Sequence, residues 1–153
     1  MTNPAPARSL AQRKHDTLHR LVTDIDAWVA TAGDGVYLVP LSFLWDGTTI
    51  LLSTPSDSVT GRNLLTSGAV RLGIGGTRDV VLVHGTVDAT PAAEIAEDVA
   101  VAFARKAGFD PRLADGPYHY FRVTPVRIQA WREVNELDGR DLMRAGRWIT
   151  PKE

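Results

Sequence analysis

The stretch Val36-Tyr37-Leu38-Val39-Pro40-Leu41-Ser42-Phe43-Leu44-Trp45-Asp46-Gly47-Thr48-Thr49-Ile50-Leu51-Leu52-Ser53-Thr54 decides the fold. It contains two strongly apolar runs, and Asp46-Gly47 stands between them. Asp-Gly in this position is typical of a type I′ hairpin turn, because glycine tolerates the positive φ that the turn demands. The sequence therefore predicts two antiparallel strands joined by a tight turn.

A short helix is expected directly after the second strand. Ser56, Asp57 and Ser58 are candidate N-caps, and Gly68 stands where a left-handed residue would end the helix. A helix start presents unpaired backbone N–H groups and a partial positive charge, which together suit a phosphate group. Arg62 adds a cation to the same segment, so the segment is a candidate phosphate site.

These residues resemble a known family, the split-barrel flavin and deazaflavin oxidoreductases related to pyridoxamine 5′-phosphate oxidase. In that family a Val-Pro strand and a Ser-x-Lys-x-Arg-Asn-Leu helix start form the cofactor site. Here the two motifs stand as Val39-Pro40 and as Ser58-Val59-Thr60-Gly61-Arg62-Asn63-Leu64, with Thr60 where the family often has Lys. The segment from Arg122 to Trp131 resembles the closing strand of the family, and the whole similarity extends from Asp26 to Trp131.

The resemblance implies a bound cofactor, either deazaflavin (factor 420) or FMN. The phosphate and ribityl chain would lie on the hydroxyl, amide and guanidinium groups after the second strand, and the ring would lie against the backbone of Val39 to Ser42. The expected cofactor-binding residues are Val39, Pro40, Leu41, Ser42, Ser53, Thr54, Ser58, Thr60, Arg62, Asn63 and Trp131. Two alternatives stay open: Arg62 pairs with a surface acid instead, and Pro40 simply marks an edge strand.

Composition restricts the class of protein. The chain has 153 residues, of which 44% are hydrophobic and 23% charged, as expected for one compact domain over residues 9–153 after a mobile tail at 1–8. The absence of cysteine excludes disulfides and thiolate metal sites. A net charge of −1 does not indicate the basic surface that nucleic-acid binding requires, so we expect no nucleic-acid partner. With no long apolar run, we expect no membrane insertion and a cytoplasmic protein.

The rest of the chain alternates helices and strands. Ser9 should cap a first helix that ends near Leu21 to Asp24, and Thr90-Pro91 should start a long helix ending at Ala107. Strands are expected at Asp26–Thr31, Ala69–Ile74, Val80–Val87 and Tyr118–Glu133, with a turn at Ala32-Gly33-Asp34-Gly35. The segment Asn135–Glu153 shows no strong periodicity, and Trp148 should anchor it on the surface.

No catalytic or metal-binding residue stands out. His15 and His19 have a spacing that can serve a metal, but without a carboxylate-histidine motif they indicate a solvated helix face. His84 has no acid partner nearby in the sequence, so we interpret it as a hydrogen-bonded barrel residue. The short strands and tight turns favour a mainly β (α+β) fold, an antiparallel split barrel of the FMN-binding type with flanking helices.

Two function classes remain. The first is an oxidoreductase that passes hydride between a flavin or deazaflavin and a small conjugated organic acceptor, because the cofactor then carries the chemistry. The second is a non-enzymatic binder of flavin, haem or another planar ligand. We also expect a homodimer, because Val36 to Trp45 is apolar on both faces and Trp131 could complete the partner's site. The alternative is that Trp131 belongs to the monomer core.

Overall fold

The structure is a computed structural model that describes residues 3–33 and 35–151. Its elements are α1 (Leu10–Thr23), β1 (Asp26–Gly33), β2 (Gly35–Trp45), β3 (Ile50–Pro55), α2 (Val59–Ser67), β4 (Ala69–Ile74), β5 (Val80–Pro91), α3 (Glu97–Ala107), β6 (Tyr118–Trp131), β7 (Asp141–Arg144) and β8 (Arg147–Trp148). Short 3₁₀ turns lie at Ala92–Glu94, Pro111–Leu113 and Val134–Glu136.

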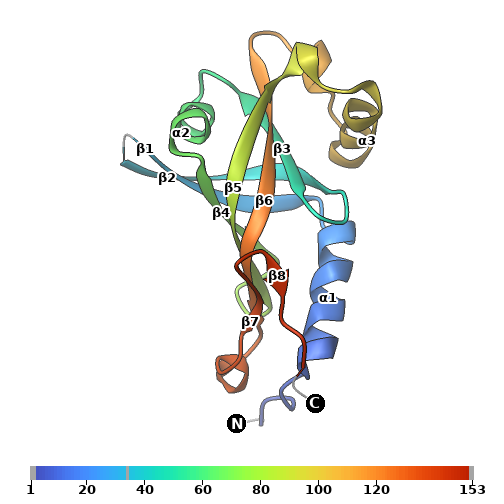
Figure 1. Cartoon of the computed structure of the whole chain (residues 1–153), viewed down its shortest axis with the longest axis vertical. Coiled ribbons are helices and arrows are strands. Elements are labelled where there is room, and N and C mark those ends of the chain that lie inside the picture. Colours follow the sequence, from blue (N-terminus) through green and yellow to red (C-terminus); the bar gives the residue numbers. More distant parts are fainter. Residues whose placement is uncertain (1–2, 34, 152–153) are drawn as a thin grey trace.

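The strands form one antiparallel sheet in the order β3-β2-β1-β4-β5-β6-β7-β8. One edge of β3 pairs with β2 and the opposite edge pairs with β6. The second pairing closes β1 to β6 into a barrel. The three helices lie around this barrel, with α2 beside the β1–β2 hairpin and α1 along the opposite side (Figure 1). The predicted mainly β antiparallel split barrel with flanking helices is therefore confirmed.

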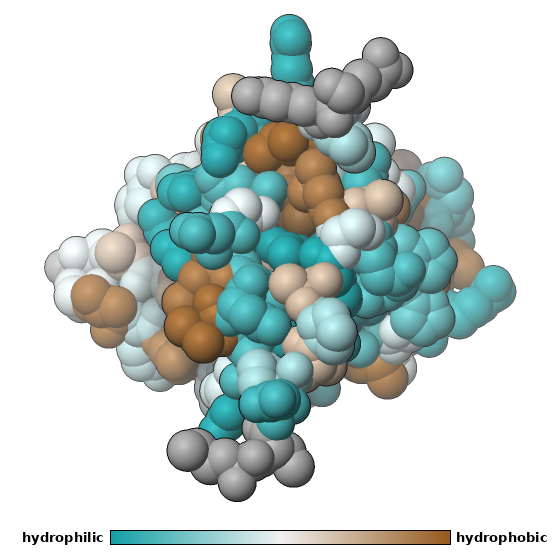
Figure 2. Space-filling view, turned by 90° about the horizontal axis from the view of Figure 1, so that it is seen from below, coloured by the Kyte–Doolittle hydropathy of each residue, from teal (hydrophilic) through white to brown (hydrophobic). Residues whose placement is uncertain are grey.

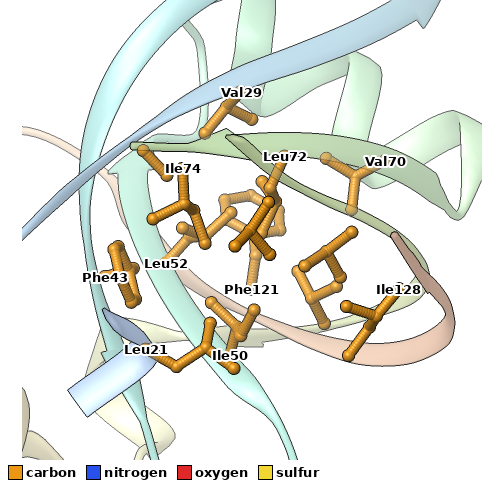
Figure 3. Packing of buried hydrophobic residues seen from close by; sticks show 14 of the residues in the cluster. Leu21, Val29, Phe43, Ile50, Leu52, Val70, Leu72, Ile74, Phe121 and Ile128 are labelled. Atoms are coloured by element: carbon orange, nitrogen blue, oxygen red, sulfur yellow. The ribbon is translucent and has the colours of Figure 1, made fainter. Parts of the chain in front are cut away.

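The barrel interior is a continuous hydrophobic core. Side chains from α1 and from the barrel strands point into it (Figure 3), among them Leu21, Val29, Phe43, Ile50, Leu52, Val70, Leu72, Ile74, Phe121 and Ile128. The sequence predicts that the face of β2 with alternate residues from Tyr37 to Trp45 points into the barrel. Phe43 of this face is buried, and Val39, Leu41 and Trp45 pack partly against the core. Tyr37 is an exception with 43% of its surface exposed, because only β1 lies beside β2 at that position.

Local cap signals predicted two helix boundaries correctly. The Ser9 hydroxyl accepts a hydrogen bond from the N–H of Gln12 at 3.1 Å and caps α1. At the other end of the short helix, Gly68 has a left-handed φ of 64° and ends α2. The predicted turn at 32–35 includes Asp34, which lies outside the described residues, but Gly33 of β1 pairs with Gly35 of β2.

The turn between β2 and β3 is longer than predicted. Trp45 pairs with Ile50, so the loop comprises residues 46–49 and not a two-residue type I′ turn. Gly47 has a φ of 102°, but Asp46 keeps a negative φ. Instead, Asp46 Oδ1 accepts hydrogen bonds from the N–H groups of Thr48 at 2.9 Å and Thr49 at 2.6 Å. This side-chain cap holds a wider loop than the Asp-Gly pair alone indicates.

The predicted helix start at Thr90-Pro91 is wrong. Strand β5 continues to Pro91, where Thr90 pairs with Tyr120 and Pro91 pairs with His119 of β6. Helix α3 begins only at Glu97, although it ends at Ala107 as predicted. The ladder with β6 satisfies the backbone of this segment, so a non-local pairing overrides the local cap signal.

The C-terminal segment contains a hairpin that periodicity did not predict. Met143 of β7 pairs with Ile128 of β6 and with Trp148 of β8, and Leu142 is buried. Trp148 packs partly against the core and lies 4.7 Å from the ammonium of Lys14, in keeping with its expected anchoring role. The two strands are too short to produce a recognisable alternation.

A buried ion-pair network closes the lower end of the molecule, where the N-terminal segment meets α1 and the 133–139 turn (Figure 1). Glu136, only 1% exposed, accepts hydrogen bonds from the backbone N–H and guanidinium of Arg8 at 2.8 Å. The Arg8 hydrogen bonds lower the pKa of Glu136 to about 2. Arg8 also contacts Asp16 and Asp79. Figure 2, which views this end, shows separate hydrophobic patches within a largely hydrophilic surface.

We expect Glu136→Gln to lower the free energy of unfolding at pH 7 by about 3 kcal/mol, because Arg8 would lose its buried counter-charge. The folded pKa of Glu136 lies below its ordinary value of 4.5, so its stabilisation is present above that pH and disappears as pH falls toward about 2. The variant should therefore show a shallower loss of stability between these pH values in urea titrations.

Glu133→Gln is the matched control, because the Arg78–Glu133 pair is largely exposed. Its effect should stay within about 0.5 kcal/mol. Equal losses in the two variants would contradict the assigned role of Glu136.

Candidate cofactor site

The corner between β3 and α2 is tight and is held by Ser58. Of the three candidate caps, the structure confirms Ser58: its hydroxyl accepts from the N–H of Gly61 at 3.0 Å and donates to Pro55 O at 2.7 Å. A Cβ at Gly61 would lie 2.2 Å from Pro55 O, so only glycine allows this approach. The corner therefore has one well-defined backbone conformation.

Most of the predicted hydroxyls gather at this corner, where Ser53, Thr54 and Thr60 are buried and Ser58 is half-buried. Ser53 donates to the carbonyl of His119 at 2.9 Å, and the hydroxyls of Thr54 and Ser58 are 3.5 Å apart. Thr60 is only 2% exposed. The protons of Ser53 and Ser58 are thus used within the chain, and these two side chains hold the corner together.

Asn63 anchors α2 to the barrel. It is 4% exposed, and its amide donates to the hydroxyl of Thr31 on β1 at 3.2 Å. A Cβ at Gly33 would lie only 2.2 Å from Asn63 Oδ1, so the Asn63 side chain packs directly against the backbone of β1. The structure therefore places Asn63 between the helix and the strand.

Arg62 is the exposed cation of the site. It donates to the carbonyl of Asp57, and no carboxylate within the described residues forms an ion pair with it. The alternative in which Arg62 pairs with a surface acid is therefore not what the structure shows. Its remaining guanidinium N–H groups lie beside the start of α2, where the N–H groups of Val59 and Thr60 precede the first intrahelical bond.

These donors fit a phosphate group. The first-turn N–H groups and Arg62 would supply hydrogen bonds and one positive charge, as at other helix N-termini that bind anions. The buried Thr60 adds no second cation where the family often has Lys. The fit is thus to a phosphate held by a single cation.

Pro40 lies on an unpaired edge of β2, which confirms the edge-strand interpretation. β2 pairs with β3 only over residues 43–45, so Gly35 to Ser42 pair with β1 alone. The backbone N–H of Phe43 donates a hydrogen bond to Ile25 O at 2.9 Å, so the backbone groups of Phe43 point to the β1 side. Backbone groups of successive residues in a strand point to opposite edges. The backbone groups of Leu38, Pro40 and Ser42 therefore face the open edge, where a planar ligand could hydrogen-bond.

Side chains of the predicted ring site point in two directions. Val39 and Leu41 pack against the core, and their backbone groups face β1, so neither residue offers a free donor or acceptor at the open edge. Ser42, on the other face, donates its hydroxyl proton to Asp26 Oδ1 at 2.6 Å. Any contact of a ring with this segment would therefore be made mainly by the backbone edge.

Within one chain, Trp131 is remote from the β3–α2 corner. It pairs with Val80 at one end of β6, whereas His119 pairs with Thr54 at the other end. Positions 119 and 131 are about 40 Å apart along an extended strand. Trp131 is half-buried, and its ring lies 5.3 Å from the guanidinium of Arg140. The structure therefore does not gather Trp131 with the other predicted residues.

Ser56 and His119 form a contact at the corner that the sequence does not indicate. The Ser56 hydroxyl lies 2.5 Å from Nδ1 of His119, whose ring stacks on Phe121. The sequence indicates Ser56 only as a candidate helix cap, and it places His119 only within the strand expected at Tyr118–Glu133. The pairing of β3 with β6 brings Ser56 close to His119, and no local sequence pattern predicts this contact.

Comparison with known proteins identifies the family. The profile described as pyridoxamine 5′-phosphate oxidase matches residues 25–132, which is more than half of the chain. The chain belongs to this family. The predicted membership is thus confirmed. No curated protein sequence is significantly similar to the chain.

Several solved structures share the fold of this family member. An F420 reductase is 16% identical with a TM-score of 0.60, over 72% of this chain and 93% of that chain. A putative pyridoxamine 5′-phosphate oxidase from Listeria innocua is 14% identical with a TM-score of 0.63, over 78% and 98%. A FAD-binding protein from Mesorhizobium loti is 17% identical with a TM-score of 0.60, over 82% and 93%.

Two further observations concern the described part of the chain. Residues 3–33 and 35–151 contain no group of three or more His, Asp or Glu side chains that could hold a metal ion. In the same ranges, no helix has the length and apolar character required to cross a membrane.

The two neighbouring residues Arg62 and Asn63 should behave differently on substitution. Asn63→Ala should destabilise the protein by about 1–3 kcal/mol, because it removes a buried hydrogen bond to Thr31. Arg62→Ala should change stability by less than about 0.5 kcal/mol, because its side chain is exposed. Chemical denaturation of both variants tests this, and a stable Asn63→Ala protein would contradict the anchoring role.

Proposed function

We propose that this protein is a flavin- or deazaflavin-dependent oxidoreductase, which passes hydride between the bound cofactor and a small conjugated organic acceptor. The observation that carries the proposal is the β3–α2 corner, where Arg62 and the first turn of α2 offer unused donors to a phosphate. Membership in the pyridoxamine 5′-phosphate oxidase family supports it. When bound, the cofactor would supply the hydride chemistry, so no nucleophile or acid of the chain is required.

Some residues of the corner would contact the cofactor, and others would only support the conformation of the site. Arg62 and the α2 N-terminus would hold the phosphate, whereas Ser53, Thr54, Ser58 and Asn63 stabilise the conformation of the corner. The open backbone edge from Leu38 to Ser42 would meet the polar edge of the ring. FMN and deazaflavin factor 420 share the phosphate-bearing stem, so the corner serves either one.

Arg62→Ala should weaken cofactor binding at least tenfold, because a charge-assisted hydrogen bond contributes about 1.5–3 kcal/mol. The measurement is a titration of the purified protein with FMN and with factor 420, followed by absorption and fluorescence. Arg78→Ala is the control, because Arg78 is largely exposed in the β4–β5 turn and should leave affinity unchanged.

Three outcomes bear on the proposal. Saturable binding weakened by Arg62→Ala, with reduction of small enones or quinones by the protein loaded with chemically reduced cofactor, would support it. Binding without turnover of any acceptor would favour the alternative, a non-enzymatic binder of flavin, haem or another planar ligand. An unchanged dissociation constant in Arg62→Ala would remove Arg62 from the site.

A homodimer with a site completed by both chains is part of the proposal. The β1–β2 hairpin carries exposed apolar side chains beyond the reach of the barrel core, with Val36 87% and Leu38 57% exposed. Burial of such a surface favours association, and a two-fold partner could bring its Trp131 to the site that Trp131 cannot reach within one chain.

Sedimentation at micromolar concentration should therefore show a dimer, and Val36→Asp should shift it toward monomer and weaken cofactor binding. Leu113→Asp is the control, because Leu113 is equally exposed, at 84%, but lies in a 3₁₀ turn away from the hairpin. A monomer that binds one cofactor per chain with full affinity would overturn the shared site.

A further inference from the structure

A second feature of the molecule is the tether between the N-terminal segment and the 133–139 turn, at the lower end of the molecule (Figure 1). The Glu136 carboxylate accepts three hydrogen bonds from Arg8: from the backbone N–H at 2.8 Å, from Nε at 3.1 Å and from Nη2 at 2.8 Å. The side-chain amide of Asn135 donates to the carbonyl of Ala5 at 2.9 Å. These contacts join residues that are 128 and 130 positions apart in the sequence.

Helix α1 adds a buried contact to the same turn. Arg13 is only 5% exposed, and its guanidinium donates to the carbonyl of Gly139 at 3.0 Å and to the carbonyl of Arg8 at 3.3 Å. One buried side chain thus connects the far end of the turn with the N-terminal segment. The tether holds the turn against the rest of the chain at both of its ends.

The turn also carries the groups that surround Trp131. The Glu136 oxygen that binds Nη2 of Arg8, Oε1, also accepts the backbone N–H of Arg132 at 2.8 Å. Beyond the turn, the guanidinium of Arg140 lies 5.3 Å from the centre of the Trp131 ring. Because the pairing of β6 with β5 already fixes the backbone of Trp131, the contribution of the turn is to hold the orientation of the indole ring.

We propose that Arg8 is a positioning residue for the cofactor site of the neighbouring chain in the dimer. Arg8 holds Glu136 and the turn, and the turn orients the Trp131 ring that each chain presents to its partner. The inference rests on the proposed function, in which Trp131 completes the β3–α2 corner of the other chain. Without Arg8, the buried carboxylate of Glu136 loses its charged partner, and the N–H of Arg132 loses a fixed acceptor.

Arg8→Gln should weaken the binding of FMN or factor 420 about threefold to tenfold, because a misoriented indole loses its stacked contact. Leu21→Ala is the matched control: Leu21 is buried in the last turn of α1, so its truncation destabilises the core without a change in the 133–139 turn. The control should bind the cofactor with wild-type affinity. Both variants are titrated at a temperature at which circular dichroism shows them fully folded.

Arg8→Lys takes the place of Arg8→Gln if the latter does not fold. Lysine keeps the positive charge beside Glu136 but lacks the planar fork of donors. Its loss of cofactor affinity should be smaller than that of Arg8→Gln and still larger than that of Leu21→Ala.

Mixed dimers separate an effect on the partner from an effect within the chain. Arg8→Gln and Arg62→Ala chains with different affinity tags are co-expressed, and the mixed dimer is isolated. One of its two sites combines an intact Arg62 with a Trp131 from the chain that keeps Arg8, so this site should regain wild-type affinity. The other site carries both substitutions and should bind more weakly than the site of either variant.

A double-mutant cycle tests whether Arg8 acts through the indole. In the Trp131→Ala background, Arg8→Gln should cause no further loss of cofactor affinity, because the ring that it orients is already absent. A role of Arg8 in general stability would give additive losses instead.

Three results would overturn the inference: equal affinities of Arg8→Gln and Leu21→Ala, additive losses in the Trp131→Ala background, and mixed dimers without a wild-type site. In each case a loss of affinity in Arg62→Ala would still support the proposed cofactor site. An unchanged affinity in Arg62→Ala, or no binding of either cofactor by the wild-type protein, would instead overturn the proposed function and the role of Arg8 together.

Discussion

The pairing of β3 with β6 is the interaction on which the rest of the structure depends. Six residue pairs, from Ile50 with Val123 to Pro55 with Tyr118, join segments that are far apart in the sequence. This ladder turns an open sheet into a barrel, so the inward side chains of both strands become fully enclosed. Without it, β3 would have only the short contact with β2 over residues 43–45.

The same ladder builds the cofactor corner. It sets the end of β3 against His119, so that Ser53 and Ser56 find partners on β6 before α2 begins. Because most polar side chains of the corner bind one another, the corner is rigid, and only Arg62 and the first helical turn keep donors for a ligand. A set of residues that looks uniform in the sequence thus separates into those that shape the site and those that can bind.

The outer surface of the barrel follows from the strand alternation. Every strand that sends one residue inward sends the next outward, and on β1, β4 and β5 the outward residues include Trp28, Gly73 and Leu82. Only the alignment of the strands places these apolar positions next to Arg71 and Arg127. The character of this outer surface, like that of the corner, is therefore a product of register.

The sequence by itself determined the local elements: the caps at Ser9 and Ser58, the stop at Gly68 and the inward face of β2 depend on neighbours a few residues away. The motif order also indicated the family. Only the tertiary structure decided that Thr90 continues a strand, that Met143 lies in a hairpin, and that His119 meets Ser56. These outcomes depend on hydrogen bonds and burial supplied by segments distant in the chain, which local propensity does not contain.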